Sequence, residues 1–125
     1  KENSEHLVRR VLGLKGNQSG VAANGAVRIG IVRQAGRIEA ARIVCSAAAD
    51  AAEDVSAVFQ RVRGGTTTAI SAATVIDDTV DAGTYVEGVL IPAALDVLPG
   101  DVIQMTLTVT SQTNLVNLYA EVDYL

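Results

Sequence analysis

The chain has 125 residues and a mass of 13.0 kDa, the length of a single domain. Apolar residues make up 49% and charged residues 19%, and this composition excludes intrinsic disorder. The net charge is −4, but all ten Lys and Arg lie within residues 1–63, whereas residues 64–125 contain eight acidic residues and no basic residue. The two halves therefore carry formal charges of +4 and −8.

The single Cys and single His exclude several kinds of site chemistry. One Cys makes no intrachain disulfide, and Cys45 lies in an apolar run where we expect it to be buried rather than reactive. A Ser–His–Asp site, a Cys–His site or a His-rich zinc site would have to use His6, which lies too close to the first residue to be a good candidate. No apolar run approaches the ~20 residues of a membrane-spanning helix. No signal peptide is visible, so we expect synthesis in a reducing cytoplasm.

The clearest secondary-structure signal is an alternation of apolar and polar residues near the end of the chain. In 101–110 and again in 115–125 every second residue is apolar, which predicts two antiparallel strands with one exposed face each. The polar segment 111–114 has the length of a hairpin loop, so the pattern predicts that the two strands pair with each other. Pro99 and Gly100 predict a type II turn before them, because Pro presets φ and Gly supplies the positive φ that follows.

Further strands are predicted upstream from β-branched residues bounded by turn residues. They are 27–31, 38–45, 55–63 and 84–91, the last of which ends at Pro92. We interpret 47–54 as a loop or one helical turn, and 69–77 as either a short strand or a turn of helix.

Strands about every 10–15 residues, without space for long helices between them, favour an all-β fold over a doubly wound α/β fold. The prediction is an antiparallel β-sandwich of jelly-roll type formed by residues 27–125. Within residues 1–26, the apolar residues of 7–14 could form one helical turn or a strand, and 15–24 is an aperiodic stretch rich in Gly, Asn, Ser and Ala. We interpret 1–26 as an N-terminal arm. Because charges are few and a small sandwich has open strand edges, we also expect burial of its sides in an oligomer.

Two other groups have a functional and a plain interpretation. Asp77, Asp78 and Asp81 could supply oxygen ligands to calcium, but they lack EF-hand spacing, and a solvated loop is the better interpretation. The segment 64–68, Gly-Gly-Thr-Thr-Thr, lacks the Lys and the following helix of a phosphate loop.

The basic residues of the first third include Arg9, Arg10 and Lys15. Nucleic acid is the first partner to consider for such a group. The pI of about 4.8 and the single aromatic residue of the basic half argue against it. The alternatives are a solvated surface and a face that docks on an acidic protein surface.

Three segments carry a resemblance to a known group: 36–50, which contains Cys45-Ser46-Ala47, then Asp81-Ala82-Gly83-Thr84, and 95–103, which contains Leu98-Pro99-Gly100-Asp101 before a Thr-rich strand. In these segments the chain resembles small jelly-roll structural proteins of tailed bacteriophages, the capsid decoration (cement) and head-fibre proteins. The resemblance covers about residues 27–125 and is one of strand spacing, Ala, Val and Thr richness and turn chemistry. Tumour-necrosis-factor-like jelly rolls share the Gly-Asp turn.

The resemblance implies a non-enzymatic virion protein that binds the outer capsid surface as a homotrimer and stabilises the head. The expected partner is the major capsid protein, and no cofactor, metal, nucleic acid or membrane is expected. The chain would be made in the host cytoplasm and reside on the virion. Arg9, Arg10 and Lys15 are the candidate capsid-docking residues, chosen for their charge. The alternative is a receptor- or carbohydrate-binding jelly-roll module of a phage fibre or cell-surface protein, although only Tyr119 among the four aromatic residues falls clearly on a predicted polar face.

Overall fold

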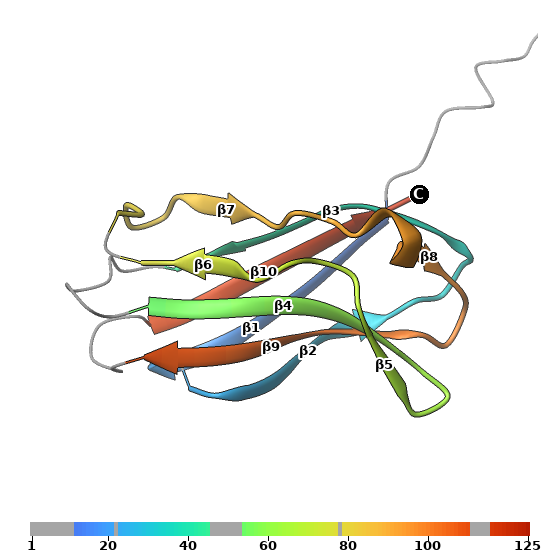
Figure 1. Cartoon of the computed structure of the whole chain (residues 1–125), viewed down its shortest axis with the longest axis horizontal. Coiled ribbons are helices and arrows are strands. Elements are labelled where there is room, and N and C mark those ends of the chain that lie inside the picture. Colours follow the sequence, from blue (N-terminus) through green and yellow to red (C-terminus); the bar gives the residue numbers. More distant parts are fainter. Residues whose placement is uncertain (1–11, 22, 46–53, 78, 111–115) are drawn as a thin grey trace, which may run out of the picture.

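The computed structural model describes residues 12–21, 23–45, 54–77, 79–110 and 116–125. In this part of the chain there is no α-helix, and two five-stranded antiparallel sheets pack face to face (Figure 1). The all-β antiparallel sandwich predicted from the sequence is confirmed. Among the same residues, no helix has the length and apolar character needed to cross a membrane.

The first sheet has the strand order β1-β10-β3-β7, with the short β8 beside β3. Its outward and inward positions alternate as the sequence predicts: on β10, Leu118 and Ala120 are buried, whereas Tyr119 and Glu121 are only partly buried. The 3₁₀ turn η2 (Pro92–Ala94) precedes β8. The strands are β1 (Leu12–Val21), β3 (Gly36–Val44), β7 (Tyr85–Glu87), β8 (Asp96–Val97) and β10 (Val116–Tyr124).

The second sheet has the order β2-β9-β4-β5, with β6 beside β4. Gly64 and Gly65 join β4 to β5 with φ of 56° and 81°, so the Gly-Gly pair forms a tight hairpin turn, which requires positive φ at both residues. The ambiguous segment 69–77 contains a short strand, β6. The strands are β2 (Gly25–Ile31), β4 (Asp54–Arg63), β5 (Thr66–Ala69), β6 (Thr74–Ile76) and β9 (Val102–Thr110).

The predicted pairing of the last two strands with each other is wrong. Both strands exist at the predicted places, but β9 pairs with β2 and β4, whereas β10 pairs with β1 and β3 in the other sheet. Apolar alternation determines which side of a strand is buried. It is the same whether the chain turns back within one sheet or crosses to the other, so it does not determine the partner strand.

Residues 12–21 also differ from the prediction, because they lie in the sandwich rather than in an arm. They form β1, which pairs with β10 from Leu12 opposite Tyr124 to Val21 opposite Val116. Gly16 lets β1 approach β2 closely, since a Cβ at this position would lie 2.6 Å from the carbonyl oxygen of Arg28. Residues 1–11 of the predicted arm lie outside the described residues.

The core lies between the two sheets and is built mainly from aliphatic side chains. Phe59 is the largest fully buried side chain, and Cys45 is buried as predicted, with 3% of its surface exposed. Both sheets and the segment before β8 contribute further buried residues: Ile29, Ile38, Ile43, Ile70, Ile76, Leu95, Ile103, Met105, Leu107, Leu118 and Val122.

The predicted turn before β9 forms and is held by an ion pair. Gly100 has a φ of 93°, and the amide of Asp101 donates to the carbonyl of Leu98 at 3.0 Å. The Asp101 side chain is 3% exposed, and its carboxylate accepts hydrogen bonds from Arg63 Nε at 2.8 Å and NH2 at 2.7 Å, and from the Leu98 amide at 2.8 Å. This contact, the Arg63–Asp101 latch, ties the end of β4 to the turn between β8 and β9.

Candidate functional site

The outer face of the first sheet carries a row of alternating charges. The strand register places Lys15 opposite Glu121, Glu121 opposite Arg42, and Arg42 opposite Glu87. The row thus crosses β1, β10, β3 and β7 in the order positive, negative, positive, negative. Because opposite charges on neighbouring strands attract, the row stabilises this face without a partner.

Arg42 is the centre of the row. Its NH1 donates to Asp123 Oδ2 at 2.9 Å and to Glu121 Oε1 at 3.2 Å, and its guanidinium carbon lies 5.7 Å from the centre of the Tyr85 ring. The hydrogen bond to Asp123 is the main reason that the pKa of Arg42 is raised above its usual value. Since two carboxylates already engage the guanidinium, Arg42 is poorly placed to bind an anion.

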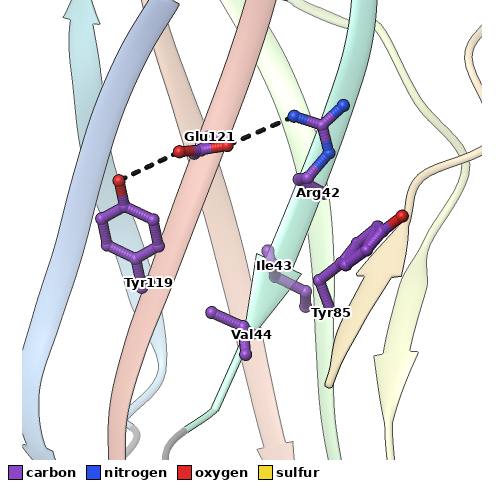
Figure 2. A pocket seen from close by; sticks show the side chains of 6 residues that line it. All are labelled: Arg42, Ile43, Val44, Tyr85, Tyr119 and Glu121. Atoms are coloured by element: carbon purple, nitrogen blue, oxygen red, sulfur yellow. Dashed lines mark hydrogen bonds and ion pairs between the residues drawn. The ribbon is translucent and has the colours of Figure 1, made fainter. Parts of the chain in front are cut away.

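A shallow hollow of about 170 Å³ lies beside this row. Tyr119, Val44 and Tyr85 face each other across β10, β3 and β7, and Figure 2 shows Val44 between the two tyrosines. Tyr85 is 54% exposed, and the Tyr119 hydroxyl donates to Glu121 Oε2 at 3.2 Å. The hollow therefore has an apolar floor, two aromatic walls and a charged end, a chemistry suited to a small amphipathic group.

The outer face of the second sheet has a different chemistry. On the central strands β4 and β9, the outward side chains after Asp54 are uncharged. The charged outward residues of this face lie at its margins: Asp54 begins β4, and Arg28 lies on the edge strand β2. We call this surface the uncharged face; its outward residues on the central strands are Ser56, Val58, Gln60, Val62, Val102, Gln104, Thr106, Thr108 and Thr110.

The middle of the uncharged face is held in place by side-chain hydrogen bonds. Gln60 Oε1 accepts from Gln104 Nε2 at 2.8 Å and from the Thr106 hydroxyl at 2.7 Å. At the β2 edge a hollow of about 260 Å³ is lined by Ile29, Gly30, Val102 and Ile31, which is 58% exposed, and by Arg28. A partner would therefore meet an ordered polar centre and, at one edge, a mainly apolar hollow with one arginine.

The residues predicted to dock on a capsid are only partly placed by the structure. Lys15 lies on the outer face of β1, in the charged row. Arg9 and Arg10 lie outside the described residues. The remaining arginines are divided between surfaces, because Arg28 is on the second sheet and Arg42 on the first, so they do not form one basic patch.

The acidic group near residue 80 is a turn within the described residues. Asp77 Oδ1 accepts from the Thr79 hydroxyl at 2.5 Å and from the Thr79 amide at 2.9 Å, and these bonds lower the pKa of Asp77. Asp78 lies outside the described residues. In the part of the chain that the structure describes, no group of three or more His, Cys, Asp or Glu is placed to hold a metal ion.

Sequence reasoning missed the two features that organise the first face. Tyr85 was not assigned to an outward position, because 84–91 does not alternate cleanly and β7 covers only three of its residues. The charged row depends on which strands are neighbours, which no local pattern encodes. The signal for the uncharged face, by contrast, was present in the Thr and Gln positions of 101–110.

Comparison with protein-family models, curated proteins and solved structures found no match to this chain, so its function is inferred from the fold and its surfaces.

Proposed function

We propose that the protein is a non-enzymatic virion structural protein, a capsid decoration protein of a tailed bacteriophage that binds the outer capsid surface as a trimer. The observation that carries the proposal is the contrast between the two outer faces. One face holds a row of charges, and the other presents no charged side chain on its central strands beyond Asp54. A protein that must contact two different surfaces at once, its own copies and a capsid, needs two such faces.

The strand order supports the jelly-roll part of the proposal. Strands from the first half of the chain pair with strands from the second half in reverse order: β1 with β10, β2 with β9, β3 with β7 and β8, and β4 with β5 and β6. A long antiparallel ribbon that rolls up on itself produces this pairing, and it is the plan of a jelly roll. Jelly rolls are frequent in capsid proteins, so the fold favours a structural role without specifying it.

The mechanical role follows from burying surface across capsid seams. A trimer that bridges neighbouring capsid subunits adds three contacts, and a contact of about 800 Å² per partner is enough for a stable interface. Because the three contacts belong to one assembly, the loss of one leaves the others in place and the assembly rebinds quickly. Internal pressure would then have to break several contacts at once to open a seam.

We assign capsid docking to the outer face of the first sheet, which we call the charged face because it carries the row of Lys15, Glu121, Arg42 and Glu87, together with the basic residues Arg9 and Arg10. Lys15 supports this assignment, because it lies on the outer face of β1 within the charged row. Contacts of this kind depend on complementary charge and weaken as salt rises.

Quantitative mass spectrometry of purified phage particles that encode this chain tests the proposal. We expect a copy number of the same order as that of the major capsid protein. Absence from the particles, or presence in only a few copies, would contradict a decoration role.

In a second test, empty heads are mixed with the Arg9→Glu/Arg10→Glu variant, which should bind less than the wild type. Arg33→Glu, at an exposed position between β2 and β3, is the matched control and should bind normally.

The hollow on the first face favours one alternative function, a carbohydrate-binding module. Its two tyrosines flank Val44, and pyranose rings stack their C–H faces on aromatic rings. In a glycan array, this alternative predicts binding that Tyr85→Ala abolishes and that Val89→Ala, at another exposed apolar position, leaves unchanged. No binding to any glycan by the wild type would reject the alternative.

A further inference from the structure

The uncharged face has the composition of a contact surface rather than of a water-exposed sheet. The central positions of its two long strands hold only Val, Thr, Ser and Gln, although the chain carries twenty-four Lys, Arg, Asp and Glu. Loss of charge at the centre is the compositional mark that separates the middle of a protein interface from the rest of a protein surface. The two arginines at the far end of β4 do not weaken this pattern. Arg63 binds Asp101, and Arg61 NH1 donates to the carbonyl oxygens of Ala94 and Asp96, at 3.2 and 2.6 Å.

We propose that a second copy of this chain covers the uncharged face. Charge is the first argument for this occupant. The outer face of the first sheet carries five charged side chains, and a second copy on that face would have to desolvate them: Lys15, Arg42, Glu87, Glu121 and Asp123. The uncharged face is the surface on which self-association avoids this penalty. A capsid surface or another partner that presents charged groups would select the charged face instead, where complementary ion pairs can form.

The area of the face is the second argument. Strands β9 and β4 have nine and ten residues, β2 has seven, and β5 and β6 beside β4 have four and three. With strands about 4.8 Å apart and about 3.3 Å per residue, they cover about 520 Å² of flat surface. Side-chain relief raises the accessible area above the flat value, toward the roughly 800 Å² per partner of a stable interface. The whole face therefore approaches the size of one stable contact between copies.

The shape of the two edges is the third argument and bears on the symmetry. The β2 edge has the 260 Å³ hollow, which is lined by Ile31 and also by Arg28, whereas the β6 edge presents Val75, which is 41% exposed. Because these apolar side chains lie at opposite sides of the face, they favour a head-to-tail contact in which the β6 side of one copy's uncharged face meets the β2 side of the next copy's. When each copy repeats the same head-to-tail contact with the next, the copies can close into a ring. The smallest such ring beyond a dimer has three copies. The inference that copies of this chain associate depends only on the uncharged face. The inference that the oligomer binds a capsid depends on the proposed function.

A pair of matched substitutions tests the inference. Val58 and Val44 are both partly buried valines that point outward on a central strand, but from opposite sheets. Sedimentation velocity of the full chain at about 10 µM should give an oligomer for the wild type and for Val44→Lys. Val58→Lys should give a monomer, because a buried unpaired charge raises the dissociation constant by about 100-fold or more. Thr108→Lys, at an exposed position of the same face, should also dissociate the oligomer and guards against a folding defect of Val58→Lys.

The outcomes separate this inference from the proposed function. A monomeric wild type at 100 µM overturns the inference, as does an oligomer that Val44→Lys dissociates and Val58→Lys and Thr108→Lys do not. An oligomer of two copies that Val58→Lys dissociates supports the uncharged face as the contact and contradicts the trimer of the proposed function. Three copies with the same sensitivity support both.

Discussion

Replacing Asp101 by Asn should destabilise the sandwich by about 2–3 kcal/mol at neutral pH. The carboxylate is almost fully buried and accepts three hydrogen bonds, two from Arg63 and one from the Leu98 amide. Hydrogen bonds to a charged group contribute roughly 1.5–3 kcal/mol each in net terms, and bonds within one network are not additive. Asn keeps one acceptor oxygen and the side-chain volume but loses the charge and the second acceptor, so the expected loss is that of about one charged hydrogen bond.

The same latch predicts the pH dependence of this loss. The hydrogen bonds from Arg63 lower the pKa of Asp101 in the folded protein. The stabilisation is therefore fully present above the unfolded-state pKa of about 3.9 and is lost as the pH falls through the lower folded-state value. The difference in stability between the wild type and Asp101→Asn should accordingly be constant from pH 5 to 7 and shrink below about pH 4.

Urea unfolding followed by circular dichroism measures the effect. A loss of 2–3 kcal/mol lowers the midpoint by on the order of 1–2 M urea for a domain of this size. The control is Asp96→Asn, which removes an ion pair with Arg37 that is 3.2 Å long and whose carboxylate is 81% exposed. Exposed pairs contribute about 0–1 kcal/mol. Equal losses for the two variants, or a loss for Asp101→Asn that persists unchanged at pH 3.5, would refute the assigned role of the latch.

Two further predictions concern packing. Gly16→Ala should lower the free energy of unfolding by about 1–3 kcal/mol, because its Cβ would overlap the backbone of Arg28; Gly13→Ala on the same strand, whose Cβ would meet Asp123 at an ordinary 3.6 Å, should change it by less than about 0.5 kcal/mol. Equal effects in chemical denaturation would contradict the close approach of β1 and β2. Cys45 should react with a thiol reagent only as fast as the protein opens, because its side chain is buried in the core. A rapid stoichiometric reaction of the native protein would contradict that placement.

The sequence predicted the strands better than it predicted their partners. Segments 27–31, 38–45, 55–63, 101–110 and 115–125 all form strands close to the expected limits. The local reason is that β-branched residues alternate with polar ones and turn residues separate the runs. Pairing depends on contacts between residues far apart in the chain, and for this reason the last two strands were placed in one hairpin instead of in two sheets.

The N-terminal segment shows a second limit of local patterns. Residues 12–21 contain three glycines and several small polar residues, a composition typical of a loop, yet they form the edge strand β1. Glycine is favourable there because the tight approach to β2 excludes a side chain at Gly16. That requirement arises from tertiary packing, so composition alone assigned the segment to an arm.

The candidate surfaces were predictable in chemistry but not in position. The Thr and Gln residues of 101–110 already indicated a polar, uncharged side of a strand, and the structure adds the equally uncharged β4 beside it. The charged row could not be predicted, because Lys15, Arg42, Glu87 and Glu121 come from four separated segments that only the sheet register brings together.

Cryo-electron microscopy of particles of the phage proposed to encode this chain would locate the protein and show which of its faces form contacts. We expect sandwiches on the outer capsid surface in groups of three. Within each group we expect the uncharged faces to contact neighbouring copies and the charged face with Lys15 to lie toward the major capsid protein. Particles without this density, or groups in which the charged faces contact one another and the uncharged faces point to solvent, would contradict the proposed arrangement.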